Sequence, residues 1–144
     1  MNAKTPHPEA LLLAPDAELV SLREDSITVL ARLGMLDADQ IEAAYRFRNA
    51  LETVVEAKRE SIGFREWQDP GPKAAEIVEQ RAIARRELSQ ARQLLGAYVY
   101  ALVGRCAGEG YSIRDLFHTR RERDTHHDLL KIGLRQLASL WVKK

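Results

Sequence analysis

The chain has 144 residues, of which 45% are hydrophobic and 30% are charged, a composition that suits one globular domain rather than a disordered chain. No run of 18 apolar residues occurs, so we expect no membrane-spanning helix, and the leucines at 11–13 are too few for a signal-peptide core. The single cysteine, Cys106, excludes an internal disulfide and fits a reducing, cytoplasmic location.

The formal net charge is +1, but the charge is unevenly distributed. Residues 105–144 contain nine Lys and Arg against five Asp and Glu, whereas acidic residues exceed basic ones in the rest of the chain. A surface that binds nucleic acid is therefore expected in the C-terminal part.

The first predicted elements are a flexible arm and a helix. Residues 1–15 contain Pro6, Pro8 and Pro15 without a sustained hydrophobic period, which is typical of an arm. From Asp16 to Gly34 the apolar residues follow helical spacing, which predicts a helix that ends at the glycine. These apolar positions are Leu19, Leu22, Ile27, Leu30 and Leu33.

A second helix is predicted from Asp37 to about Lys58. Asp37 and Gln40 have the spacing of a capping box, in which each side chain accepts from the backbone amide of the other residue. The segment 60–72 cannot continue this helix, because Pro70 and Pro72 interrupt it. We expect Phe64 and Trp67 to hold this loop against the helices as a lid, with an aromatic ligand clamp as the alternative.

A long helix is predicted from about Lys73 to Ala107, polar in its first half and apolar in its second. Its polar half must stand in solvent or pack in an oligomer along one apolar line, formed by Ile77, Ala84, Leu88 and Ala91. Gly108 and Gly110 are expected to end the helix.

The C-terminal segment has the element order of a helix-turn-helix. Ser112 and Asp115 form a variant capping box before a short helix that presents Ile113, Leu116 and Phe117 on one face. A polar turn from 118 to 124 follows, and either Asp124 or Thr125 is expected to cap a last helix ending at about residue 142. In a helix-turn-helix, the second of these helices enters the major groove of DNA.

The helical period of this last helix separates an apolar face from a basic stripe. His126 is predicted to point inward, and Gly133 is expected to let another helix approach closely. The predicted core face comprises Leu129, Leu130, Gly133, Leu134, Leu137, Leu140 and Trp141. The stripe on the other side comprises His127, Lys131 and Arg135.

These basic residues are the candidate DNA-binding site. His127 and Lys131 are expected to meet base edges or phosphates, with Arg135 farther along the groove wall. The turn residues Arg120, Arg121 and Arg123 are expected to hold phosphates. The alternative is an ordinary solvated helix face, which the nearby acidic residues favour: Glu122, Asp124 and Asp128.

Two stretches carry a resemblance. The segment from Leu94 to Leu140 resembles the C-terminal helix-turn-helix of uncharacterised phage- and prophage-type proteins and, more distantly, region four of sigma factors. It contains Ser112-Ile113-Arg114-Asp115-Leu116 and then Leu130, Gly133-Leu134 and Leu137-Ala138. The segment 33–48 resembles the one that precedes it in those proteins. The resemblance covers somewhat over half of the chain and implies DNA binding in transcription control or phage DNA handling. The turn from 118 to 124 departs from the pattern, since it is long and lacks glycine.

No catalytic motif is present. The sequence contains no phosphate loop, nucleophile elbow or dinucleotide fingerprint, so we expect neither an enzyme, nor a cofactor, nor a small-molecule substrate. A zinc site could be imagined from Cys106, His118, His126 and His127, but the spacing between them is not that of metal ligands, and no metal is expected.

The sequence therefore predicts an all-α protein in three parts: an arm over 1–15, a helical region with an aromatic loop over 16–72, and a long helix with a helix-turn-helix over 73–144. The predicted function is binding of double-stranded DNA as a transcriptional regulator of phage or prophage type. A homodimer or a higher homo-oligomer through the long helix is expected, because one such module gains specificity from two half-sites. The alternatives are a small terminase-like DNA-packaging subunit and a helical adaptor that binds proteins but not DNA.

Overall fold

The computed structural model describes residues 24–63 and 74–142, in which all regular secondary structure is helical. The all-α prediction is confirmed. The elements are α3 (Ser26–Arg32), α4 (Ala38–Gly63), α5 (Ala74–Val103), the π-helical turn η1 (Gly104–Gly108), α6 (Ile113–Leu116) and α7 (Arg120–Trp141). The predicted arm over 1–15 and the proposed lid residues Phe64 and Trp67 lie outside the described residues.

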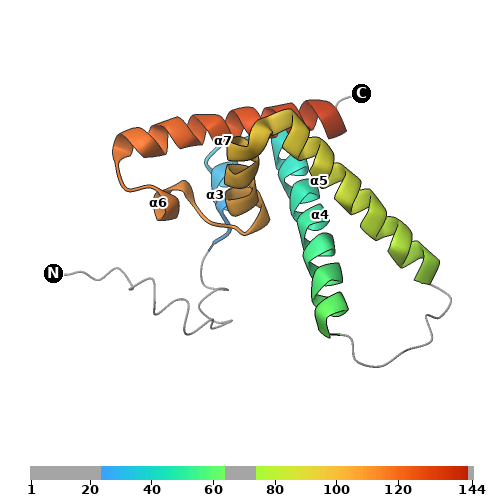
Figure 1. Ribbon diagram of the computed structural model, residues 1–144. Coiled ribbons are helices and arrows are strands. Elements are labelled where there is room, and N and C mark those ends of the chain that lie inside the picture. Colours follow the sequence, from blue (N-terminus) through green and yellow to red (C-terminus); the bar gives the residue numbers. More distant parts are fainter. Residues whose placement is uncertain (1–23, 64–73, 143–144) are drawn as a thin grey trace.

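The helices α4 and α5 form a hairpin in which they lie close together near α7 and diverge away from it (Figure 1). The residues of α5 that face this hairpin are Ala84, Leu88, Ala91 and Leu95, which are all buried and follow one another at intervals of three and four. The buried residues of α4, which packs against α5, include Ala43, Phe47 and Ala50. Of the apolar line expected to stand in solvent or to join an oligomer, Ala84, Leu88 and Ala91 are therefore buried within the chain, whereas Ile77 is 44% exposed.

Ion pairs between α4 and α5 add to this apolar contact. The Arg46 guanidinium donates to the Glu87 carboxylate at 2.6 and 2.8 Å, and Arg81 lies 2.5 Å from the Glu60 carboxylate. The helix α4 also continues to Gly63, one turn beyond the predicted end near Lys58. The hairpin is thus longer than the hydrophobic pattern indicated.

The predicted long helix is broken at Gly96. This residue has φ of +85° and ψ of 161°, a backbone conformation that is essentially restricted to glycine. The break separates the part of α5 that pairs with α4 from the short part that leads into η1 and contacts α7 (Figure 1). The expectation of one uninterrupted helix to Ala107 is wrong at this point, although helical backbone does extend to Gly108, and Gly110 follows with φ of +87°.

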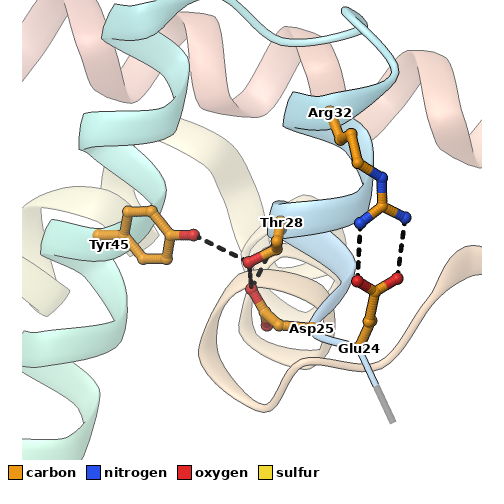
Figure 2. A network of polar contacts seen from close by, with 5 residues as sticks. All are labelled: Glu24, Asp25, Thr28, Arg32 and Tyr45. Carbon is orange, nitrogen blue, oxygen red and sulfur yellow. Dashed lines mark hydrogen bonds and ion pairs between the residues drawn. The ribbon is translucent and has the colours of Figure 1, made fainter.

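The short helix α3 begins at Ser26, where Asp25 caps it (Figure 2). The Asp25 carboxylate accepts from the amide of Thr28 at 3.2 Å and pairs with Arg48 of α4. Because Asp25 itself is extended, the predicted continuous helix from Asp16 to Leu33 is wrong, and the residues before Glu24 lie outside the described part.

The polar network around this cap ties α3 to α4. Figure 2 shows the Glu24 carboxylate accepting from both terminal nitrogens of Arg32, at 2.7 and 2.8 Å. It also shows the Thr28 and Tyr45 hydroxyls sharing a hydrogen bond of 3.2 Å between the two helices.

The last helix, α7, lies across one end of the bundle and closes the core (Figure 1). Its buried residues are His126, Leu130, Gly133, Leu134, Leu137 and Ala138, which confirms the inward direction predicted for His126 and most of the predicted core face. Leu140 is the exception at 44% exposure. Trp141 packs against the core cluster, with the Arg46 guanidinium 5.2 Å from its ring centroid. None of the helices in the described ranges has both the length and the apolar character that crossing a bilayer requires.

Candidate nucleic-acid interface

Three residues, 117–119, connect α6 to α7. Phe117 is the C-cap of α6 and Thr119 is the N-cap of α7. The Thr119 hydroxyl accepts from the amide of Glu122 at 3.1 Å, and the Glu122 carboxylate accepts from the amide of Thr119 at 3.3 Å. The predicted cap at Asp124 or Thr125 is wrong, because this reciprocal capping box places the N-cap at Thr119, five residues before Asp124. The long turn expected from 118 to 124 is therefore replaced by a compact one.

The helix before this turn is also capped as predicted. The Ser112 hydroxyl accepts from the amide of Asp115 at 3.2 Å, and the Asp115 carboxylate accepts from the amide of Ser112 at 3.1 Å. Ile113 buries its side chain in the core, which holds α6 against the bundle although α6 has only one turn. Both helices of the candidate module thus begin at a complete capping box.

The early start of α7 changes the surroundings of the three arginines that were predicted to lie in the turn. Arg120 and Arg121 lie in the first turn of α7, and both are exposed. The Arg120 side chain is 94% exposed and lies 3.9 Å from the Asp124 carboxylate, one turn farther along. Arg123 is half-buried, and its Nε donates to the carbonyl oxygen of Phe117 at 2.9 Å. Arg123 therefore holds the turn, whereas Arg120 and Arg121 point charge outward.

The predicted stripe lies beside the beginning of α4. The Gln40 side-chain nitrogen donates to the carbonyl oxygen of Lys131 at 2.9 Å, and Arg135 pairs with the Asp37 carboxylate. The Asp37 carboxylate accepts a hydrogen bond from the amide of Gln40 and a second one from Arg135. The first of these has the larger effect, and both lower the pKa of Asp37, so this carboxylate is charged at neutral pH. Arg135 is therefore partly neutralised by its own chain.

His127, at the start of the stripe, is half-buried. Burial, followed by the nearby Lys131 charge, lowers its pKa below the ordinary histidine value, so the imidazole is neutral at pH 7. Lys131 is the third residue of the predicted stripe. Its side chain is half-exposed, and it forms no ion pair with another described residue. The helical period placed these three residues on one side, but it could not show that the capped end of α4 lies next to them.

Acidic residues share the exposed surface of α7. Glu122 is occupied by the Thr119 cap, and its hydrogen bond to the Thr119 amide lowers its pKa. Asp124 and Asp128 are exposed. The exposed surface of α7 therefore carries cations in its first turn, at Arg120 and Arg121, and anions one and two turns later.

His126 lies beneath this surface, in contact with three parts of the module. Its Nδ1 is 2.7 Å from the carbonyl oxygen of Glu122, and its Nε2 is 2.5 Å from the Tyr98 hydroxyl. Its ring is stacked on Phe117 at a centroid distance of 3.6 Å and an interplanar angle of 16°. The sequence predicted the inward direction of His126, but it gave no signal for the partner on α5.

The part of the chain that the structure describes contains neither a metal centre nor a reactive thiol. Across the described ranges, no three His, Cys, Asp or Glu side chains come together as metal ligands would. Cys106 is buried in η1, where burial raises the pKa of its thiol to about 12, with a smaller effect from the Asp115 charge. A thiol with this pKa is protonated at neutral pH and unreactive.

Comparison with known proteins gives no match to a family model, a curated protein or a solved structure.

Proposed function

We propose that this protein binds double-stranded DNA through the N-terminal half of α7, as a helix-turn-helix regulator. The observation that carries the proposal is the three-residue connection between two capped helices, the second of which begins with Arg120 and Arg121 exposed. A helix-turn-helix uses a turn of about three or four residues, and the N-terminal residues of its second helix meet the DNA.

The structure changes which residues are expected to do the binding. Arg120 and Arg121 become the principal cations, because they are exposed at the end of α7 that would enter the groove. Lys131 is expected to reach a phosphate from the flank. Arg123 and Arg135 make smaller contributions, since each makes a close bond within the chain, to Phe117 and Asp37 respectively. Arg120 only approaches Asp124, at 3.9 Å, and its side chain stays 94% exposed.

The experiment is a fluorescence-anisotropy titration of a random-sequence duplex at several salt concentrations. We expect binding at low salt that weakens steeply as salt rises, because each phosphate contact releases condensed counterions. Light scattering of the same samples gives the stoichiometry and separates a dimeric regulator from a ring oligomer, the form we expect of a DNA-packaging subunit. Absence of duplex binding at low salt would overturn the proposal.

An adaptor that binds another protein is the second candidate. The surface that favours it lies on the halves of α4 and α5 farther from α7 (Figure 1). Large apolar side chains are exposed there, among them Val55, Ile77, Val78 and Ile83. Such residues scattered singly are normal on a surface, so a contiguous patch is required for this function. Replacement of Val78, which is 63% exposed, by Ser would weaken a protein complex in this case and leave DNA binding unchanged.

A further inference from the structure

The placement of the proposed DNA-binding end of α7 depends on His126. This is the first buried residue of the helix, and none of the six residues before it is buried. Figure 1 shows this end of α7 extending past the bundle, with only the single turn of α6 beneath it. Arg120 and Arg121 are therefore held in position by the contacts of the turn and of His126 rather than by core packing.

The polar contacts of His126 define which ring nitrogen carries the proton in the neutral imidazole. A carbonyl oxygen can only accept, so the nitrogen 2.7 Å from the Glu122 carbonyl, Nδ1, carries a proton. In the neutral imidazole Nε2 is then an acceptor, and the Tyr98 hydroxyl donates to it at 2.5 Å. Together with the stacked ring of Phe117, this hydrogen bond joins α5, the turn and α7 at one side chain.

Tyr98 comes two residues after the break at Gly96. It is 62% exposed, so burial of its ring contributes little to the core. Its tilted contact with the His126 ring and its hydroxyl hydrogen bond are what connect it to α7. A tyrosine in this place therefore contributes one directional bond to the base of the DNA-binding helix.

We propose that Tyr98 and His126 are positioning residues for DNA binding. Their hydrogen bond fixes the N-terminal turns of α7 relative to α5, so that Arg120 and Arg121 are presented in one orientation. The inference rests on the proposed function, and it adds that affinity depends on two residues that do not touch the DNA. When the bond is lost, only a fraction of molecules holds the binding orientation, and the observed affinity falls by that fraction.

The test is Tyr98→Phe, which removes the hydroxyl and keeps the ring. We expect duplex affinity to fall by up to about fivefold, the order expected for loss of one hydrogen bond, and the midpoint of thermal unfolding to fall by only a few degrees. The slope of affinity against salt should not change, because every phosphate-binding cation is retained. Tyr45→Phe is the matched control, since its hydroxyl is bonded to Thr28, far along the chain from α7, and its loss should leave affinity unchanged.

Amide hydrogen exchange without DNA is the second measurement. In Tyr98→Phe, exchange should become faster at residues 120–126 and stay unchanged at residues 130–138, which are anchored by the core. If the parent protein binds duplex and the variant matches it in affinity or in exchange, the positioning role is refuted while the proposed function stands. If the parent does not bind duplex, both are refuted.

Discussion

Gly133 of α7 lies directly against Val99 of α5. A Cβ atom on Gly133 would be 3.0 Å from Val99 Cγ1 and 3.3 Å from Val103 Cγ2, which is tighter than ordinary side-chain packing. The part of α5 that follows the break thus crosses α7 at its one buried glycine. This close approach places Tyr98, next to Val99, within reach of His126.

Gly133→Leu should destabilise the protein by about 1–3 kcal/mol, because the larger side chain overpacks this crossing and outweighs its better helix propensity. Chemical denaturation measures the effect. Gly104→Ala is the control, since nothing lies within 4 Å of a Cβ at that position, and its stability should be unchanged or higher. A Gly133→Leu protein more stable than the parent would show that the helices do not meet there.

The break in α5 makes the sign of a second substitution informative. In an unbroken helix Gly96→Ala would stabilise by about 1 kcal/mol. Here space is available around the position, but φ of +85° is strained for alanine, and we expect a loss of about 1–3 kcal/mol instead. Thermal unfolding with circular dichroism distinguishes the two, and a higher melting temperature would mean that α5 is continuous.

Local signals in the sequence predicted much of the fold. The capping boxes at Asp37–Gln40 and Ser112–Asp115 form as expected, because each needs only residues three apart. The sequence does not predict the break at Gly96, because this glycine stands within a strong helical pattern and a single glycine is compatible with a continuous helix. The candidate site was predicted only in part.

The start of α7 shows how local signals compete. Thr119 and Glu122 have the spacing of a capping box, as readable in the sequence as the cap expected near Asp124. The packing of Phe117 on His126 and the hydrogen bond from Arg123 to Phe117 favour the earlier start. A helical period could assign His127, Lys131 and Arg135 to one side of α7, but the neighbours of that side come from Asp37 and Gln40, some 90 residues away in the chain.

Gln40 supplies a third prediction, because its amide both caps α4 and donates to α7. The oxygen accepts from the amide of Asp37 at 2.9 Å, and the nitrogen donates to the Lys131 carbonyl at 2.9 Å. Gln40→Glu keeps the cap but sets a carboxylate against that carbonyl, so we expect a loss of about 1–3 kcal/mol at pH 7.

The same variant should recover part of its stability at low pH. Protonation of the new carboxyl group restores a donor toward Lys131, and repulsion from that carbonyl raises the folded pKa of this group above the ordinary glutamate value of about 4.3. The difference from the parent should therefore shrink as pH falls from 7 toward about 4. Urea unfolding at pH 7 and pH 4 measures this difference. Gln80→Glu, at an exposed position, is the control and should show no such pH-dependent difference. If Gln40→Glu is as stable as the parent at pH 7, the contact between Gln40 of α4 and the Lys131 carbonyl of α7 is contradicted.

The buried thiol of Cys106 predicts a loss of stability in alkali. Its folded pKa of about 12 exceeds that of an exposed thiol, near 8.5. Between these values the unfolded chain has released a proton that the folded chain keeps, so stability falls as pH rises, by roughly 1 kcal/mol per pH unit above about pH 9. Denaturant unfolding of the parent and Cys106→Ala from pH 8 to 10 isolates the thiol, because the half-buried Tyr100 is common to both. Equal slopes would contradict the burial of Cys106.

The arginines give the prediction that bears most directly on function. Arg121→Ala should reduce the slope of log affinity against log salt by about 0.9, since one phosphate contact is lost. Arg59→Ala removes the same charge from an exposed position on α4 and should leave the slope unchanged. Arg135→Ala should lower stability through the lost Asp37 pair and affect DNA affinity less than Arg121→Ala does. Anisotropy titrations of all three variants on one duplex, with denaturation curves alongside, measure both effects. If Arg59→Ala and Arg121→Ala weaken binding equally, DNA is attracted by net charge alone, and the assignment of the interface to α7 is wrong.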